Sequence, residues 1–374
     1  MVNGYMEFSL AIKPRKNMQT RKINSENKQP ILNVGIVGFG LSGQVFHAPF
    51  IDVNPHFNLH TIVTTGTLAG EKYPLVKIAS SFEELMANPE IDLVIVCSPN
   101  TLHFQHASAA LQAGKHVIVE KPFTVNSSEA QNLIDISHKS GKFVFPFHNR
   151  RWDSDFLTIK YLIAQGLLGK VVDYESRFDR FTPEISRAAW RYQQEAGGGT
   201  LFDLGIHLID QAVSLFGTPD GVFCRLFNQR EGSVTDDSFD LKLIYPDLNV
   251  TLKASVFVKE PGPRFQVHGT QGSFVKYGLD SQEAQLRLGE KPVSKGFGLE
   301  PASQRGILNT GLLGKEFRGR YKTFPGDYME FFNNVYSVIA DSSEMVIKPE
   351  DALMNIRIIE AARVSDKEQR IIQL

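Results

Sequence analysis

The feature that most restricts the fold is a regular alternation of strand-like and helix-like segments between residues 32 and 147. Short apolar runs predict strands at 32–38, 59–65, 92–97, 116–119 and 142–147, and helical periodicity predicts helices at 80–86, 101–113 and 127–140. Parallel strands need crossover segments between them, which are usually helices. The alternation therefore predicts an α/β protein whose N-terminal part is a doubly wound parallel sheet.

A glycine-rich turn follows the first predicted strand directly. It reads Gly38-Phe39-Gly40-Leu41-Ser42-Gly43 and leads into a helical pattern. In such a turn the first glycine permits the sharp bend, the second leaves room for a pyrophosphate, and the third lets the helix pack closely on the strand. Free amides at the start of the helix would face the phosphates. We predict that residues 31–150 form a dinucleotide-binding domain, with cofactor contacts at Gly38, Gly40, Leu41, Ser42 and Gly43.

The end of the second predicted strand bears on which dinucleotide is bound. An Asp or Glu at this place usually binds the ribose hydroxyl of NAD. Here the strand ends in Val63-Thr64-Thr65-Gly66-Thr67, with no acid before Glu71. Without a carboxylate to repel a 2′-phosphate, and with hydroxyls at Thr64 and Thr65, we expect NADP to be preferred. The usual arginine is also missing, so we expect a modest preference and some binding of NAD.

Polar residues follow the next two strands of the series. Pro99 and Asn100 come after the strand at 92–97, and Glu120 and Lys121 after the strand at 116–119. Ligands of open α/β sheets sit beyond the carboxyl ends of the strands, so we expect these four residues to lie at the ligand. A solvated strand-end lysine is the alternative for Lys121. Pro122 argues against it, because proline makes the turn that carries the lysine rigid.

A second glycine run marks the other half of the chain. The sequence from Gly197 to Asp210, GGGTLFDLGIHLID, continues as an amphipathic helix pattern in which Asp203 and His207 are four residues apart. That spacing stacks both side chains on one helix face, where they form a plausible proton-handling pair. A surface Asp–His pair explains the spacing equally well. The glycines favour the functional interpretation, because they let a backbone or a ligand approach the start of the helix.

After residue 150 the pattern changes to a second domain, residues 151–374, predicted to bind substrate and to form oligomers. Helical periodicity appears at 156–164, and two-residue alternation predicts strands at 171–178, 222–229, 238–245, 250–258 and 264–268. This alternation is typical of an antiparallel sheet with one covered face. Residues 280–325 are rich in glycine and charge and are expected to be long loops. Two closing helices are predicted at 328–340 and 350–365, the last able to pack back on the first domain.

Composition excludes several other classes of protein. A net charge of −1 provides no field to attract nucleic acid or a membrane surface. The two cysteines, Cys97 and Cys224, lie in apolar runs and are expected to be reduced, as in the cytoplasm. Residues 1–30 are basic and lack a secretory signal, so we expect a mobile tail with at most a short strand near 6–12. No metal site is predicted, since no further ligand pattern joins His103 and His106.

Taken together, GxGxxG, Glu120-Lys121-Pro122 and the Asp203–His207 pair resemble the Gfo/Idh/MocA oxidoreductase family, from about residue 31 to the C-terminus. The segments at 148–153 and 263–269 resemble its subgroup of bacterial NADP-dependent scyllo-inositol dehydrogenases. The resemblance implies hydride transfer between NADP(H) and a secondary alcohol of a cyclic polyol or sugar. It implies that Lys121 orients and polarises the hydroxyl, that His207 is the general base, and that Asp203 binds a substrate hydroxyl.

The resemblance implies further contacts and an assembly. Cofactor contacts are also expected at His103, Trp190 and Arg191, and Arg150 is a weaker candidate for the substrate pocket. A homodimer or homotetramer is expected, because relatives cover the open face of the sheet with another subunit. A nearby Asp203 carboxylate is expected to raise the pKa of His207. Two alternatives stay open: a non-catalytic dinucleotide-sensing regulator, and an NAD-dependent glycosidase of the same family.

Overall fold

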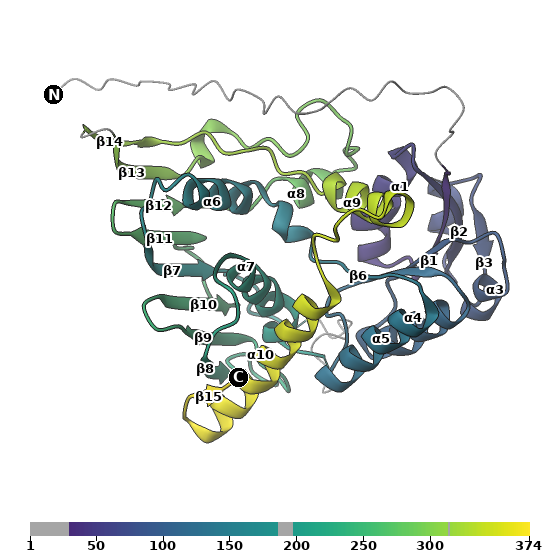
Figure 1. Cartoon of the computed structure of the whole chain (residues 1–374), viewed down its shortest axis with the longest axis horizontal. Coiled ribbons are helices and arrows are strands. Elements are labelled where there is room, and N and C mark those ends of the chain that lie inside the picture. The colour runs from purple at the N-terminus through teal and green to yellow at the C-terminus, as the bar shows by residue number, and fades with distance from the viewer. Residues whose placement is uncertain (1–29, 186–196, 313–314) are drawn as a thin grey trace. The chain divides into compact units, whose positions relative to one another are not determined.

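The computed structural model describes residues 30–185, 197–312 and 315–374 (Figure 1). Residues 31–374 form one compact unit that contains two sheets. The expected N-terminal tail, its short strand, and the pair Trp190 and Arg191 lie outside the described residues.

The first sheet is parallel and has six strands in the order β3-β2-β1-β4-β5-β6. The strands are β1 (Leu32–Val37), β2 (Phe57–Val63), β3 (Lys77–Ala79), β4 (Leu93–Val96), β5 (His116–Val119) and β6 (Val144–Pro146). Its helices are α1 (Ala48–Val53), α2 (Leu68–Lys72), α3 (Phe82–Met86), α4 (His103–Gln112) and α5 (Ser127–Ser140). All four residues of β4 are buried, as expected for a central strand with both faces covered. The predicted doubly wound sheet is confirmed.

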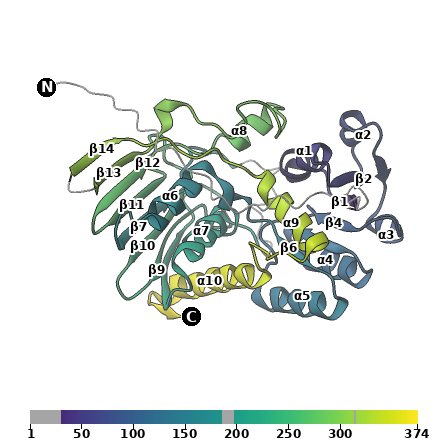
Figure 2. The same cartoon turned by 45° about the horizontal axis from the view of Figure 1, so that its top comes forward.

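The second sheet is mixed and mostly antiparallel, with nine strands in the order β14-β13-β12-β11-β7-β10-β9-β8-β15. Its strands are β7 (Val171–Arg177), β8 (Gly221–Phe227), β9 (Ser238–Ile244), β10 (Asn249–Ser255), β11 (Phe265–Gly269), β12 (Gly272–Lys276), β13 (Ile307–Leu312), β14 (Lys315–Arg320) and β15 (Ile372–Gln373). Helices α6 (Ser154–Ala164), α7 (Ile206–Phe216) and α10 (Pro349–Glu368) cover one face with apolar side chains (Figures 1 and 2). The other face carries cross-strand charge pairs such as Lys253–Asp240 at 2.7 Å.

The prediction of long loops at 280–325 is wrong in part. This region contains α8 (Gln282–Arg287) and the hairpin of β13 and β14 at the edge of the second sheet. Every β14 residue is exposed or half-buried. An edge strand without a buried face has no reason to alternate apolar and polar residues, so its sequence lacks the usual signal. The short strands β3, β12 and β15 were also not predicted.

Helix α10 is shared between the two sheets. Its first turns, at Ala352 and Leu353, join the apolar core beside α5 of the first sheet. Its later residues Ile358, Ile359 and Ala362 join the core under the second sheet. A helix that contributes to both cores fixes the carboxyl ends of the parallel strands relative to α7 (Figure 2). The shorter helix α9 (Met329–Asp341) contributes apolar side chains to the core of the first sheet.

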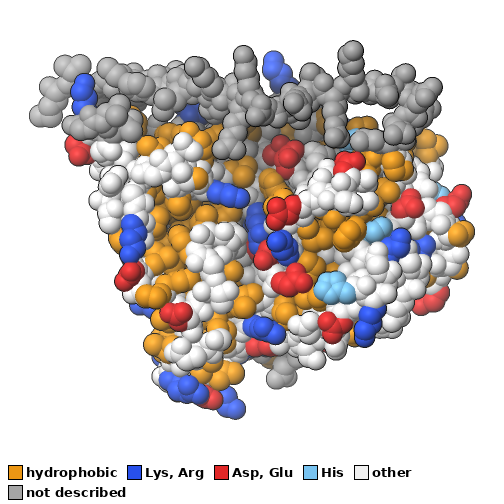
Figure 3. Space-filling view, in the orientation of Figure 1, with side chains coloured by type: hydrophobic (Ala, Val, Ile, Leu, Met, Phe, Trp, Pro, Cys, Tyr) orange, Lys and Arg blue, Asp and Glu red, His pale blue; other side chains and the backbone are white. Residues whose placement is uncertain are grey.

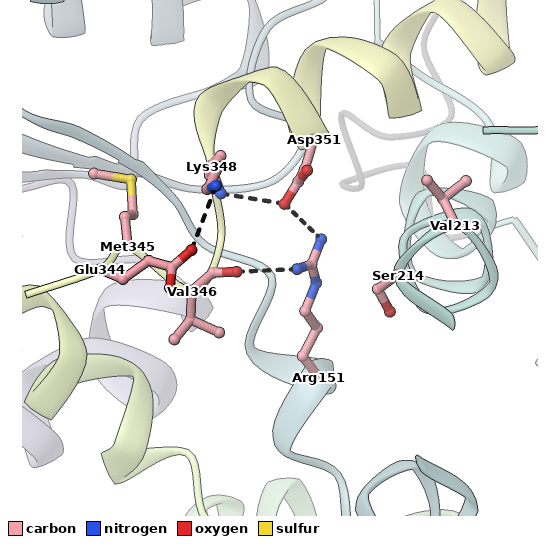
Figure 4. Close-up of a pocket in the computed structure, with 8 residues that line it drawn as sticks. All are labelled: Arg151, Val213, Ser214, Glu344, Met345, Val346, Lys348 and Asp351. Atoms are coloured by element: carbon pink, nitrogen blue, oxygen red, sulfur yellow. Dashed lines mark hydrogen bonds and ion pairs between the residues drawn. The ribbon is translucent and has the colours of Figure 1, made fainter. Parts of the chain in front are cut away.

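A charged network also holds α7 to α10. Arg151, just before α6, makes two hydrogen bonds of 2.8 Å to the buried carboxylate of Asp210 on α7, and lies 3.2 Å from Asp351 on α10. Asn355 on α10 donates a third bond to Asp210 at 3.0 Å. Figure 4 shows Arg151 reaching Asp351 and the carbonyl of Val346 in a surface pocket of about 480 Å³. The network anchors α7, the helix that carries His207.

In the view of Figure 3, acidic and basic side chains of the described residues are interspersed without a large patch of one sign. None of the helices in the described ranges is long and apolar enough to cross a lipid bilayer.

We predict that Asp210→Asn lowers the free energy of unfolding by about 3–5 kcal/mol, because it leaves the largely buried Arg151 charge without its main partner. Denaturant unfolding of the full chain measures the change. The matched control is Asp247→Asn, which breaks an exposed pair with Lys170 and is expected to leave the stability almost unchanged. Equal losses in the two variants would contradict the role given to Asp210.

Candidate functional site

The three glycines of the first turn meet three different surroundings. Gly38 has φ +92°, and a Cβ there would lie 2.7 Å from the Cys97 carbonyl oxygen after β4. A Cβ on Gly43 would lie 2.5 Å from the Gly38 carbonyl oxygen. A Cβ on Gly40 would meet no atom within 4 Å. The first and third glycines thus serve the turn itself, while the second leaves open space of the kind a pyrophosphate needs.

Glu120 joins this turn to the loop after β5. Its carboxylate accepts a hydrogen bond from the Ser42 hydroxyl, lies 2.8 Å from His47 Nε2, and accepts the backbone N–H of Lys121 at 2.9 Å. Burial alone would raise the Glu120 pKa, but the hydrogen bonds from His47 and Ser42 lower it to about 2. Glu120 is therefore ionised at neutral pH, and it holds the backbone that carries Lys121.

The sequence pattern does not indicate that His47 belongs to the site, because the backbone around it is not a regular α-helix. Residues Gly43–His47 form a π-helical turn, in which hydrogen bonds join residues five positions apart. Ser42 and His47 are five residues apart and both reach Glu120. In an α-helix of 3.6 residues per turn this spacing would place them on different faces. The sequence contains no signal that identifies such a turn.

Lys121 reaches across to the segment after the second glycine run. Its ammonium donates hydrogen bonds to the backbone carbonyl of Asp203 at 2.7 Å and to Asp203 Oδ1 at 2.8 Å. Both side chains are less than one fifth exposed. The two residues that the sequence places on different segments, 82 positions apart, are thus brought together by the fold.

The segment with Asp203 is not the single α-helix that the spacing predicts. Leu201–Gly205 forms a second π-helical turn, and α7 begins at Ile206. Asp203 therefore lies in the π turn, and His207 lies in the first turn of α7. The side chains are not stacked by a regular α-helix, and the partner of Asp203 is Lys121. Turns of this kind occur frequently at functional sites.

Asp236 lies close to the glycine run at 197–199, as expected for glycines that let another segment approach the start of the helix. Gly199 has φ +96°, and a Cβ there would overlap the Asp236 carboxylate. Asp236 accepts the N–H of Thr200 with its carbonyl at 2.8 Å and the N–H of Leu201 with its carboxylate at 2.7 Å. These bonds satisfy amides that the start of a helix leaves without partners.

His207 is only 5% exposed, and its Nδ1 has no hydrogen-bond partner among the described residues. Burial and the positive charges of Lys121 and Arg150 lower its pKa well below the usual value. The prediction that Asp203 raises the pKa of His207 is wrong. Asp203 pairs with Lys121, and the charges that act most strongly on the His207 ring are positive. His207 is thus neutral at neutral pH, the state in which an imidazole accepts a proton.

His103 and Asn100, two of the expected cofactor residues, make hydrogen-bond contacts with the loops that follow the strands. His103 Nδ1 lies 2.7 Å from the carbonyl oxygen of Pro122, and its Nε2 lies 2.9 Å from that of Ser98. The ring therefore connects the loops after β4 and β5. Asn100 donates its side-chain amide to the Gly197 carbonyl at 3.0 Å, beside Pro99. His103 and Asn100 thus position the loops around the candidate site.

The remaining expected residues have mixed surroundings. Arg150 is paired with Asp153 at 3.3 Å and with Glu283 at 2.6 Å, so its guanidinium already has carboxylate partners. Thr64 Oγ1 accepts the N–H of Gly66 at 3.2 Å. Thr65, just after β2, and Leu41, in the glycine turn, are both exposed. No group of three or more His, Cys, Asp or Glu side chains that could hold a metal occurs within the described ranges.

Comparison with known proteins gives consistent matches over both halves of the chain. Residues 32–148 match the family model described as the oxidoreductase family, NAD-binding Rossmann fold. Residues 160–374 match the model described as the oxidoreductase family, C-terminal alpha/beta domain. The open space at Gly40 fits a nicotinamide dinucleotide, the cofactor of that fold.

Individual relatives cover nearly the full chain. The NADP⁺-dependent scyllo-inositol 2-dehydrogenase IolW of Bacillus subtilis is 39% identical over 94% of this chain and 98% of its own length. The oxidoreductase YdgJ of Escherichia coli is 38% identical over 90% of this chain and 96% of its own length. The structure of YvaA from Bacillus subtilis aligns with a TM-score of 0.88 and 38% identity, covering 93% of this chain and 99% of that one. A structure from Bacteroides fragilis aligns with a TM-score of 0.86 and 44% identity, covering 92% and 100%.

We predict that Gly40→Val weakens binding of a nicotinamide dinucleotide at least about tenfold, because its side chain fills the open space of the turn. Fluorescence titration with the reduced cofactor measures the change. Thermal unfolding without cofactor should stay near wild type, since a Cβ at Gly40 meets no neighbour. Gly262→Val is the matched control, as a Cβ at Gly262 also meets no atom within 4 Å. Unchanged cofactor affinity in Gly40→Val would reject the assignment of this turn.

Proposed function

The chain belongs to the Gfo/Idh/MocA oxidoreductase family of NAD(P)-dependent dehydrogenases acting on CH–OH groups, and from this premise we propose a specific reaction for it. The reaction is hydride transfer between NADP(H) and a secondary alcohol or ketone of a cyclic polyol or sugar. Two observations support the proposal. Lys121 is paired with Asp203, and the helix that follows Asp203 directly carries the buried, neutral His207. The name of the Bacillus subtilis relative, a scyllo-inositol 2-dehydrogenase, supports the substrate class.

Each of these side chains has a distinct role in the proposal. When bound, the nicotinamide supplies the hydride acceptor or donor. Lys121 donates a hydrogen bond to the reacting hydroxyl oxygen and stabilises the negative charge that develops there. His207 takes the hydroxyl proton during oxidation and returns it during reduction. Asp203 fixes the Lys121 ammonium through the 2.8 Å contact and binds a substrate hydroxyl with its remaining acceptor capacity.

We assign cofactor binding to residues 31–150 and substrate binding to residues 151–374. Gly38, Gly40, Leu41, Ser42 and Gly43 would hold the pyrophosphate, with Glu120 fixed behind them. Pro99, Asn100 and His103 would shape the loops that enclose the nicotinamide end. Trp190 and Arg191 remain candidates from the sequence alone.

A homodimer or homotetramer remains our proposal for the assembly. The uncovered face of the nine-stranded sheet is the candidate interface. Its charge pairs, such as Lys253–Asp240, mean that the sheet does not need an apolar cover to be stable. The interface would therefore be polar, with complementary charges setting the register between subunits.

The preference for NADP depends on the end of β2. Thr64 and Thr65 follow the strand without a carboxylate that would repel a 2′-phosphate. The Thr67 hydroxyl is already used, since it donates to the Glu71 carboxylate at 2.9 Å. This contact removes one donor and brings an acid near the strand end, so the preference should be modest. Hydroxyl contacts alone contribute less than the roughly 1.5–3 kcal/mol of a charge-assisted bond.

We predict that His207→Ala lowers the rate of alcohol oxidation by about 10²–10⁴-fold, the usual contribution of a positioned base. In the wild type, oxidation should decline only as the pH falls through the lowered pKa of His207, since the base is neutral above it. Steady-state rates between acid and neutral pH test this. His138→Ala, on the exposed face of α5, is the control and should keep the wild-type profile. Near-normal turnover of His207→Ala would make Lys121 the next candidate base.

We predict that the enzyme binds NADP⁺ more tightly than NAD⁺, and that Thr65→Asp reverses the order by adding a carboxylate that repels the 2′-phosphate. Competitive titration of the two cofactors measures both affinities. Glu71→Gln should increase the NADP⁺ preference, because it removes the negative charge beside Thr67. Equal or tighter binding of NAD⁺ by the wild type would show that this interpretation of the strand end is wrong.

A further inference from the structure

His47 lies in an aromatic core and contacts a carboxylate there. Its side chain is fully buried, and the centre of its ring lies 4.1 Å from that of Phe147 and 6.0 Å from that of Phe332. Its Nε2 lies 2.8 Å from Oε1 of Glu120, while its buried Nδ1 has no hydrogen-bond partner among the described residues. A polar nitrogen left unpaired in a core costs free energy. Packing alone therefore does not explain a histidine at this position.

The two carboxylate oxygens of Glu120 face different parts of the candidate site. Oε1 accepts the hydrogen bond from the Ser42 hydroxyl and contacts His47 Nε2, at the two ends of the first π-helical turn. Oε2 accepts the backbone N–H of Lys121 at 2.9 Å. An ionised carboxylate only accepts hydrogen bonds, so His47 Nε2 carries the hydrogen in this contact. Glu120 thus joins the glycine turn to the lysine proposed to act on the substrate.

The charge of Glu120 depends chiefly on His47. Burial raises the pKa of Glu120, and the contact with His47 opposes this rise more strongly than Ser42 or Lys121 does. Three further titratable groups interact with this charge: Cys97, His103 and His148. Burial raises the pKa of the thiol and lowers the pKa of both imidazoles, so all three groups are neutral at neutral pH. They do not replace His47 as a partner of the carboxylate.

We infer that His47 is a positioning residue, which holds Glu120 so that the glycine turn and Lys121 keep their places relative to each other. The inference rests on the proposed function of Lys121, but its effect on the cofactor turn is measurable without turnover. It assigns the residue a role in both cofactor binding and hydride transfer, although His47 is too deeply buried to be a surface ligand.

The inference predicts a pH dependence that the wild type lacks. With an apolar residue in place of His47, burial is opposed less and the pKa of Glu120 rises from its wild-type value of about 2. Glu120 of the variant then takes up a proton as the pH falls into mild acid, and its hold on Ser42 and Lys121 weakens. Wild-type Glu120 stays ionised through the same range.

A role in packing alone makes the opposite prediction for two substitutions. In His47→Phe the new ring can fill the space beside Phe147 and Phe332, but it donates no hydrogen bond. In His47→Gln the ring is lost, but the side-chain amide can donate to Glu120. If the ring is what matters, Phe is the better replacement. If the hydrogen bond is what matters, Gln is.

The test measures binding of NADP⁺ and of NAD⁺ to the full chain by isothermal titration calorimetry, at neutral pH and in mild acid. Each variant is compared with the wild type at the same pH, so that titration of the cofactor's own phosphates cancels. We expect His47→Phe to bind about tenfold or more weakly in mild acid, with a smaller loss at neutral pH. His47→Gln should keep most of the wild-type affinity at both pH values.

His56→Phe is the matched control, because His56 also stacks on an aromatic ring, that of Tyr336 at 4.1 Å, but lies just before β2. It should follow the wild type. Glu120→Gln removes the carboxylate charge itself and should weaken binding by the same factor at both pH values. Adding Glu120→Gln to His47→Phe should therefore abolish the extra loss in mild acid.

The inference is overturned if His47→Phe follows the wild type at both pH values, if it binds better than His47→Gln, or if the double variant keeps the extra loss. Thermal unfolding checks that each variant folds. Should His47→Phe not fold, the other two single variants decide, since a His47→Gln protein that binds as weakly as Glu120→Gln, or a Glu120→Gln protein with wild-type affinity, also overturns it.

Turnover is followed separately by the formation of reduced nicotinamide. Since Lys121 is proposed to act on the reacting oxygen in the transition state, His47→Phe should lower kcat more than it raises KM for the alcohol. Absence of turnover in the wild type would reject the proposed reaction, whereas the comparison of cofactor affinities would still decide whether His47 acts through Glu120.

Discussion

The contact between Lys121 and Asp203 is the interaction on which the candidate site depends. It joins the loop after a strand of the parallel sheet to the helical segment that covers the antiparallel sheet. Lys121 is in turn held by Glu120, which also holds Ser42 of the glycine turn. A short chain of charged and polar side chains therefore connects the cofactor turn to the residues proposed to handle the substrate. Displacement of any member would alter both ends of that chain.

Two π-helical turns, at 43–47 and 201–205, place the side chains of this connection. One brings Ser42 and His47 to the same carboxylate, and the other carries Asp203 just before the α-helix with His207. Such turns are rare and frequently occur at functional sites. The helix that carries His207 is anchored by the Arg151–Asp210 pair and by α10, which contributes to the cores of both sheets. Ordinary packing and buried ion pairs thus hold the helix that follows the second π-helical turn in place.

Much of the fold follows from the sequence, because buried parallel strands and the glycine turn have strong local patterns. Helix α5 was predicted with its observed bounds, since Asn126 caps its start and Gly141 its end. The edge hairpin of β13 and β14 was not predicted, because exposed strands lack apolar alternation. The motifs identify Lys121, Asp203 and His207 as candidate site residues, and this assignment stays a prediction. Their pairing, the role of His47 and the lowered pKa of His207 depend on contacts between distant segments and on π turns, which no local pattern encodes.

The most direct test of the central claim is a comparison of the wild type with Lys121→Met on a panel of cyclic polyols, sugars and sugar acids, with NADP⁺ and with NAD⁺. Formation of reduced nicotinamide is followed by absorbance. The account predicts turnover of at least one ring compound by the wild type, and a loss of about a hundredfold or more in the variant, with cofactor binding retained. Absence of turnover with every compound, or a variant as active as the wild type, would contradict it.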